Sequence, residues 1–223
     1  MAELETTQRS ELVRLGADRH RDPAAVLDRT EVVLAHGAAP DLRALALWVR
    51  GLALHELSEH DAAVDSFRSA ISISDSHGLT DVGARARAHL AVSLLQLGHS
   101  EAAHRALDEA GAAGSSEAAG LVDFVAALFA QRRGVATTPS CSSTAHRELI
   151  ERDDHATIGL VHLNRSVSYA YADDLDRARD EADAAERLAT EHGLTMLAAM
   201  AAHNLGFAKV DAAGWRTGCV GSR

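Results

Sequence analysis

The sequence predicts an all-α fold, a solenoid of stacked helical hairpins with about four and a half units. Three observations lead to this prediction. Ala, Leu, Arg, Asp, Glu and His dominate a chain of 223 residues in which 4% of residues are aromatic and 3 are proline, and strand-favouring runs are nearly absent. Related segments recur along the chain, and three His-Gly pairs follow apolar helical stretches.

Two repeats of different length run along the chain. In the long repeat, HGLTDVGARARAHLAVSL from His77 aligns with HGLTMLAAMAAHNLGFAK from His192. In the short repeat, SEHDAAVDSFRSA (58–70) aligns with GHSEAAHRALDEA (98–110), and ADDLDRARDEADAA from Ala172 is a third copy. Each unit is expected to contain a first helix with small residues at its centre, a tight polar turn and an Ala-rich second helix, since small residues let two helices approach closely.

Local signals place the helices to within about 2–4 residues. Asp22 and Pro23 mark a start, as the cap and the first helical residue. The pairs His36-Gly37, His77-Gly78 and His192-Gly193 mark helix ends, where Gly supplies a left-handed residue and His suits the negative end of the dipole. The expected helices are 6–18, 22–36, 41–57, 61–76, 80–97, 100–111, 116–133, 144–152, 155–172, 175–192 and 195–209.

Two further helix starts are expected from acidic residues. Ser58, Glu59 and His60 are expected to form a turn that leads to a cap at Asp61. A cluster around the start of the tenth helix lacks the central Gly and final Glu of a calcium loop, so we expect it to cap that helix. The cluster comprises Asp173, Asp174, Asp176 and Asp180.

The repeat breaks in two places. Residues 135–145 (VATTPSCSSTA) interrupt a hairpin, because Pro139 falls where the repeat needs a small residue and the Ser-rich composition opposes helix. Residues 210–223 (VDAAGWRTGCVGSR) offer three glycines and no apolar face. We therefore expect one repeat domain over 1–209 with a damaged hairpin at 135–145, a disordered tail at 210–223, and a truncated or frame-shifted product of a longer gene.

The repeat pattern resembles that of the tetratricopeptide (TPR) repeat. In the first unit Gly51, Ala63, Phe67 and Ala70 stand at the places of its small, Ala, aromatic and Ala positions, and later units match more weakly in the same register. This resemblance implies a right-handed superhelix of antiparallel hairpins.

A second resemblance covers most of residues 22–209. HGLTDVGARARAHLAVSLLQLGHSEAAHRALDEA and LNRSVSYAYADDLDRARDEADAAERLATEHG followed by AAHNLGFAK are similar to the N-terminal repeat region of actinobacterial CHAT-domain proteins. That family implies a C-terminal caspase-like peptidase domain that uses a His and a Cys. No catalytic residue carries over, because Cys141 and Cys219 both lie in the anomalous segments, and no enzyme activity is expected.

Charge and motifs exclude several classes of partner. A net charge of −10 with no local cluster of Lys and Arg disfavours nucleic acid and anionic membranes. The N-terminus has neither the basic start nor the apolar core of a signal peptide, and no apolar run is long enough to span a membrane, so a cytoplasmic location is expected. Glycine-rich phosphate loops and serine-hydrolase motifs are missing from the sequence, and no cofactor is expected.

HELSEH, which starts at His55, differs by one residue from a zinc-protease motif. That motif needs two histidines four residues apart. His55 and His60 are five apart, so in a continuous helix their side chains would point in directions about 140° apart around the helix axis. His99 and His104 have the same spacing in the next unit, which indicates a repeat feature. No metal site is expected.

The remaining candidate site is the concave face that first helices would line. Asn164 and Asn204 stand at one repeat position in different units, where an amide can pair with the backbone of an extended peptide or bond to its neighbouring helix. Trp48 stands at an apolar position of a helix, where a tryptophan more often packs in the core than anchors a ligand. The candidate residues are Trp48, His55, Arg85, His89, Gln96, Gln131, Arg132, Asn164, Tyr171, His203 and Asn204.

These observations favour an interaction module that binds a peptide or protein partner on the concave face, as the sensing or recruiting part of a longer CHAT-type protein. The alternative is the ligand-sensing helical domain of a transcriptional regulator. Leu205 and Phe207 are expected to be exposed at the uncapped C-terminal end, where the chain could also self-associate.

Overall fold

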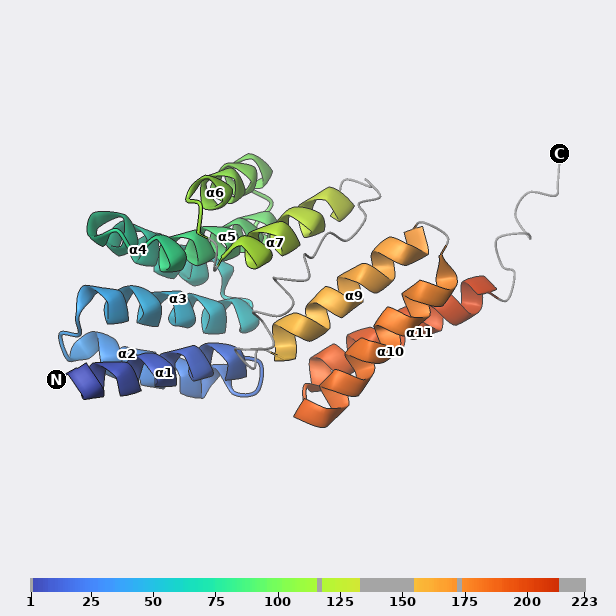
Figure 1. Ribbon diagram of the computed structural model, residues 1–223, viewed down its shortest axis with the longest axis horizontal. Helices are drawn as coiled ribbons and strands as arrows, with labels where there is room; N and C mark the ends of the chain where they lie inside the picture. Colours follow the sequence, from blue (N-terminus) through green and yellow to red (C-terminus); the bar gives the residue numbers. More distant parts are fainter. Residues whose placement is uncertain (1, 116–117, 133–154, 172–173, 213–223) are drawn as a thin grey trace. The chain divides into compact units, whose positions relative to one another are not determined.

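The computed structural model describes residues 2–115, 118–132, 155–171 and 174–212, and over these residues it contains helices and no strand (Figure 1). The all-α prediction is confirmed for this part of the chain. The expected helix at 144–152, the damaged hairpin at 135–145, both cysteines and most of the predicted tail lie outside the described residues. The helices are α1 (Ala2–Asp18), α2 (Pro23–Ala35), α3 (Pro40–Glu56), α4 (His60–His77), α5 (Thr80–Gln96), α6 (Ser100–Ala112), α7 (Ala119–Arg132), α9 (His155–Tyr171), α10 (Leu175–His192) and α11 (Thr195–Ala212).

Local signals set several of the helix ends as expected. The Asp22 carboxylate accepts a hydrogen bond from the Ala25 backbone N–H at 3.0 Å, and Asp174 accepts one from the Arg177 N–H at 3.3 Å, so both residues cap helices. The glycines of the three His-Gly pairs have φ of 66° (Gly37), 67° (Gly78) and 66° (Gly193), the left-handed conformation that favours glycine. The cap expected at Asp61 is wrong: Asp61 lies in the first turn of α4, which begins at His60 after Glu59.

The short repeat appears in the backbone hydrogen bonds of two turns. Between α3 and α4 the N–H of Ser58 donates to His55 and that of Glu59 donates to Leu54, both at 2.9 Å. Between α5 and α6 the N–H groups at the equivalent positions, 98 and 99, donate to the carbonyls of positions 95 and 94. Ser58 has φ 62° and Gly98 has φ 81°, so the two turns share one left-handed position.

The chain divides into two compact units, residues 1–126 and 127–223. In the first unit each helix from α1 to α6 packs on the next along the chain, apart from a weaker contact of α1 with α2. Phe67 of α4 is 0% exposed and lies over Gly51 of α3, where a Cβ atom would come within 2.5 Å of its ring. The small-residue position and the aromatic position of the predicted repeat therefore meet in the core.

Alternate helices of the first unit also touch. α1 contacts α3 and α3 contacts α5, whereas no comparable contact joins α2 to α4 or α4 to α6 among the described helices. The first helices of successive hairpins are therefore closer together than the second helices.

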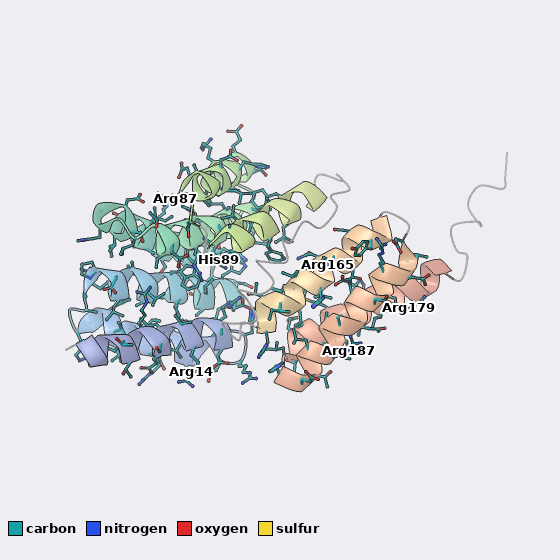
Figure 2. The ribbon with its side chains drawn as sticks, viewed as in Figure 1. Arg14, Arg87, His89, Arg165, Arg179 and Arg187 are labelled. Carbon is teal, nitrogen blue, oxygen red and sulfur yellow. The ribbon has the colours of Figure 1, made fainter. Side chains whose placement is uncertain are left out.

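In the second unit α9, α10 and α11 pack side by side (Figure 1). Polar contacts cross from α9 to α10, where Glu181 lies 2.7 Å from His162 Nδ1 and forms an ion pair with Arg165, labelled in Figure 2, at 2.6 Å. Leu205 of α11 is 6% exposed, so its predicted exposure is wrong, because this residue faces the inner side of its unit. The apolar core of the unit is Leu163, Ala185, Ala189, Leu194, Leu197 and Ala201.

Among the described residues no helix combines the length and the apolar character that crossing a membrane requires.

Candidate partner-binding face

Three of the predicted site residues meet where α3 contacts α5. The Trp48 indole N–H lies 3.3 Å from His89 Nδ1, and the two ring centroids are 5.8 Å apart with the rings edge to face. The guanidinium of Arg85 lies over the Trp48 ring, 5.7 Å from its centroid. A cation in this position is attracted by the electron-rich face of the indole ring.

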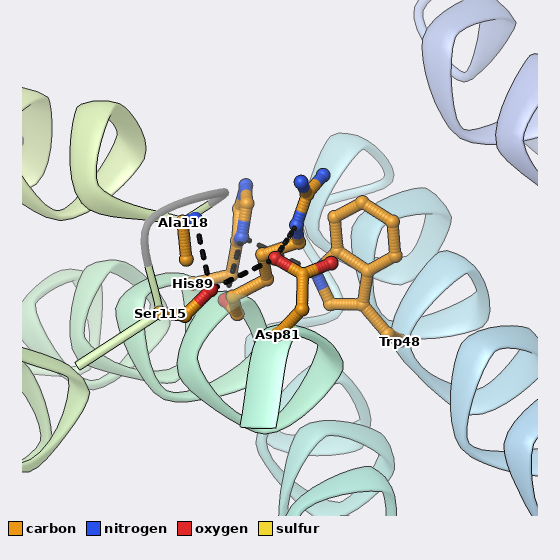
Figure 3. A network of polar contacts seen from close by, with 6 residues as sticks. Trp48, Asp81, His89, Ser115 and Ala118 are labelled. Atoms are coloured by element: carbon orange, nitrogen blue, oxygen red, sulfur yellow. Dashed lines mark hydrogen bonds and ion pairs between the residues drawn. The ribbon is translucent and has the colours of Figure 1, made fainter. Parts of the chain in front are cut away.

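Helix geometry explains why the polar residues gather. Asp81, Arg85 and His89 follow one another at every fourth position of α5 and so share one side of that helix. The Arg85 Nε donates to the Asp81 carboxylate at 2.9 Å. Figure 3 shows this row beside Trp48 of α3.

A serine outside the helices joins the row to the next element. The Ser115 hydroxyl donates to Asp81 Oδ1 at 3.2 Å and accepts a hydrogen bond from the Ala118 N–H at 3.1 Å (Figure 3). Ala118 immediately precedes α7, so these bonds connect α5 to the start of that helix. Neither Asp81 nor Ser115 is among the predicted site residues; the spacing of Asp81 from Arg85 could have indicated the first, whereas no sequence signal points to the second.

His89 can make only one of two hydrogen bonds with its Nδ1 atom. This atom lies 3.0 Å from the Arg85 carbonyl oxygen as well as 3.3 Å from the Trp48 indole nitrogen. An unprotonated Nδ1 accepts from Trp48, whereas a protonated Nδ1 donates to the carbonyl. The ring therefore combines a donor and an acceptor whose roles change with the position of one proton.

His55 lies further along α3. Its Nδ1 is 2.9 Å from the hydroxyl oxygen of Ser93 on α5, which makes a second polar link between the two helices. Burial, as the largest cause, lowers the pKa of His55 to about 4, while the negative charge of Glu56 opposes this shift. The imidazole is therefore neutral at neutral pH.

Glu56 belongs to a partly buried cluster of ionisable groups that the sequence did not indicate. Its carboxylate lies 2.7 Å from His20 Nδ1 and 3.7 Å from Arg19 Nε, and Arg19 is only 5% exposed. Burial acts to raise the pKa of Glu56, but the hydrogen bond and charge of His20, together with Arg19, outweigh it and hold this pKa below its ordinary value. The cluster ties the end of α1 to the end of α3.

The two histidines of HELSEH lie on different helices, His55 near the end of α3 and His60 at the start of α4, with ring centroids 4.9 Å apart. The turn brings their rings together, although a continuous helix would have separated them. Over the described residues, no group of three or more His, Cys, Asp or Glu is arranged to hold a metal ion.

The other predicted residues are distributed over both units. Gln96, the last residue of α5, is exposed, and so is His203 on α11. The Asn164 amide donates to the Leu160 carbonyl of its own helix at 2.9 Å, and the Asn204 amide donates to the Leu163 carbonyl of α9 at 3.5 Å. Gln131, Arg132 and Tyr171 lie at helix ends, and their side chains are outside the described part of the structure.

The Asn204 bond corresponds to the simpler of the two expectations for these amides, namely a bond to a neighbouring helix. The first unit therefore holds the assembled part of the candidate face: Trp48, His55, Arg85 and His89, with Gln96 at its edge and Asp81, Ser93 and Ser115 added by the structure. We call this set the α3–α5 face.

Comparison with known proteins identifies no function for this face. The chain matches no protein-family model and no curated protein.

Proposed function

We propose that the chain is a TPR-like helical-repeat module that binds an extended peptide segment of a partner protein on the α3–α5 face. In this proposal the hairpins are antiparallel, the stack is a right-handed superhelix, and the α3–α5 face is on its concave side. The module binds without catalysing a reaction and acts in the cytoplasm.

The observation that carries the proposal is the contact between alternate helices. When first helices touch and second helices do not, the stack is shorter on the side of the first helices, which supports a concave face formed by α1, α3 and α5. The order of contacts supports antiparallel hairpins: Ser66 bonds to the Leu47 carbonyl, whereas His60, earlier in α4, meets His55, later in α3.

The chemistry of the face suits an extended backbone. A peptide offers alternating N–H donors and carbonyl acceptors, and the face offers the Asp81 carboxylate, the Arg85 guanidinium and the neutral His55 ring within one surface. Because these groups already contact α3, α5 or the start of α7, they are held in place before a partner binds, which lowers the entropy lost on binding.

Two wider assignments belong to the same proposal. The resemblance to the repeat region of CHAT-domain proteins favours recruitment or sensing for a peptidase, and the alternative remains ligand sensing for a transcriptional regulator. A peptide partner favours the first assignment, and a small-molecule effector that binds the same face would favour the second.

Selection from a random peptide display library against the full chain tests the proposal. Selected peptides should bind the parent protein and lose about tenfold in affinity, or about 1.4 kcal/mol, with Arg85→Gln. The matched control is Arg68→Gln, an exposed arginine on α4, which should leave the affinity unchanged. If Arg85→Gln has no effect on any selected peptide, or if purified chain shows hydrolytic turnover, the proposal fails.

A further inference from the structure

Helix α11 carries an exposed apolar face. Met196 is 74% exposed and Met200 is 44% exposed, and four neighbours on the same side are also exposed. A Cβ atom at Gly206 would meet nothing within 4 Å. We call this surface the α11 outer face; it comprises Met196, Ala199, Met200, Ala202, His203 and Gly206.

The same chain contains a covered version of this face. The long repeat aligns α11 with α5, and one stripe is buried in both helices: Leu197, Ala201 and Leu205 in α11 correspond to Val82, Ala86 and Leu90 in α5. The next stripe differs. Ala84, Ala88 and Ala91 of α5 are each 0% exposed, whereas their counterparts Ala199, His203 and Gly206 are exposed.

Contacts on either side of the stripe identify what covers it in α5. On one side Arg87 Nε lies 3.6 Å from the Glu109 carboxylate of α6, and on the other side Asp81 accepts a hydrogen bond from Ser115, just after α6. Helix α6 packs on α5 between these two points. It does so with a stripe of small residues and one leucine, namely Ala103, Ala106, Leu107 and Ala110.

From this register we infer that the α11 outer face is a docking site for an amphipathic α-helix of the α6 type, supplied by a partner protein. The partner helix presents small residues with one leucine at the spacing of α6, and it continues the α5–α6 packing on α11. The chemistry agrees, because the α11 outer face contains no Asp, Glu, Lys or Arg and methionine adapts its shape to an incoming helix. The inference does not depend on the function proposed for the α3–α5 face.

The side chain of His203 leads to a prediction about the affinity for a helix. It stands where α5 has Ala88, which is fully buried against its covering, so a bulky imidazole should hold an incoming helix away from α11. His203→Ala restores the surface of α5 and should strengthen helix binding. Unchanged helical circular dichroism of His203→Ala would show that a gain of affinity of this kind does not come from unfolding.

The test uses a fluorescent synthetic peptide with the sequence of residues 97–114 of this chain (LGHSEAAHRALDEAGAAG), titrated with the full chain. Because a short isolated helix is marginally stable, we expect a Kd on the order of 100 μM. His203→Ala should bind several-fold more tightly, and Ala199→Glu should abolish binding. Ala24→Glu, at an exposed position of α2, is the matched control and should bind like the parent.

Three results would overturn the inference. In the first, the peptide binds neither the parent nor His203→Ala. In the second, it binds with an affinity that Ala199→Glu leaves unchanged, which would place it elsewhere. In the third, sedimentation shows a concentration-dependent dimer of the chain that Ala199→Glu disrupts, while the peptide does not bind. A second copy of the chain would then occupy the α11 outer face. This result would agree with the self-association predicted from the sequence.

Discussion

The contact between Gly51 and Phe67 yields a quantitative prediction for the first unit. A Cβ atom on Gly51 would lie 2.5, 2.7 and 2.9 Å from three atoms of the Phe67 ring, which is 0% exposed and so has little room to move. Overpacking of this kind costs about 1–3 kcal/mol, and the better helix propensity of Ala returns about 1 kcal/mol. Gly51→Ala should therefore destabilise the unit by up to about 2 kcal/mol.

The chain itself supplies the compensating pair. In the next copy of the short repeat, Ala91 and Leu107 occupy the places of Gly51 and Phe67, and both are buried. Phe67→Leu alone should cost about 1–2 kcal/mol of lost burial and packing. In the double variant the smaller side chain admits the new methyl group, so the two losses should fall short of additivity by about 1 kcal/mol or more.

Urea unfolding of the four proteins in the cycle measures this coupling. A Trp215→Phe background leaves Trp48, which lies on α3 near Gly51, as the single tryptophan and reporter of the first unit. Additive losses within about 0.5 kcal/mol would refute the idea that these two residues define the hairpin spacing. A stabilised Gly51→Ala variant would refute it as well.

Three further outcomes are expected from the turns, the caps and the buried histidine. Ser58→Gly should stabilise the chain by about 0.5 kcal/mol, because Ser58 adopts the left-handed φ of 62° at the position that Gly98 takes in the next copy, and an unchanged melting temperature would argue against strain there. Asp22→Ala should cost about 1 kcal/mol in urea unfolding, whereas Asp28→Ala at an exposed position of the same helix should cost almost nothing. Because the folded pKa of His55 is about 4, below its ordinary value of 6.5, protons bind the unfolded chain more readily between these values, and stability should fall by about 2 kcal/mol from about pH 7 to about pH 5. His55→Gln should flatten this pH dependence, and an equally steep profile in that variant would assign it to other groups.

The helix boundaries were predictable because their signals are local. Asp22 and the three glycines after histidine act within a few residues of themselves, so the sequence is enough to place them. The error at Asp61 is also local, a shift of the helix start by one residue. The backbone hydrogen bonds of Ser58 and Glu59 close a short turn, so α4 begins at His60, before the acidic residue.

The partners of individual side chains are harder to predict because they depend on which helix faces them. Repeat register predicts Trp48, Arg85 and His89 as site residues, and the structure brings them together. Register left two partners open for Asn204, a peptide or a neighbouring helix, and could not indicate that Ser115 would reach Asp81, because both contacts depend on the distance between elements far apart in sequence.

The long repeat also shows how one scaffold can present two chemistries. In α5 the row is Asp81, Arg85 and His89, and in α11 the same places hold Met196, Met200 and Asn204. The buried stripe beside each row is apolar in both helices, so the packing that positions the row is shared while the row itself differs. Since the backbone at these positions is set by the shared stripe, exchanging the row should change what a helix binds without changing how it packs. Met196→Asp with Met200→Arg should therefore leave the helical circular dichroism intact and keep binding of the α6-type peptide, because α5 carries Asp81 and Arg85 at these places and still packs on α6. A loss of helicity would show that the methionines serve the fold instead.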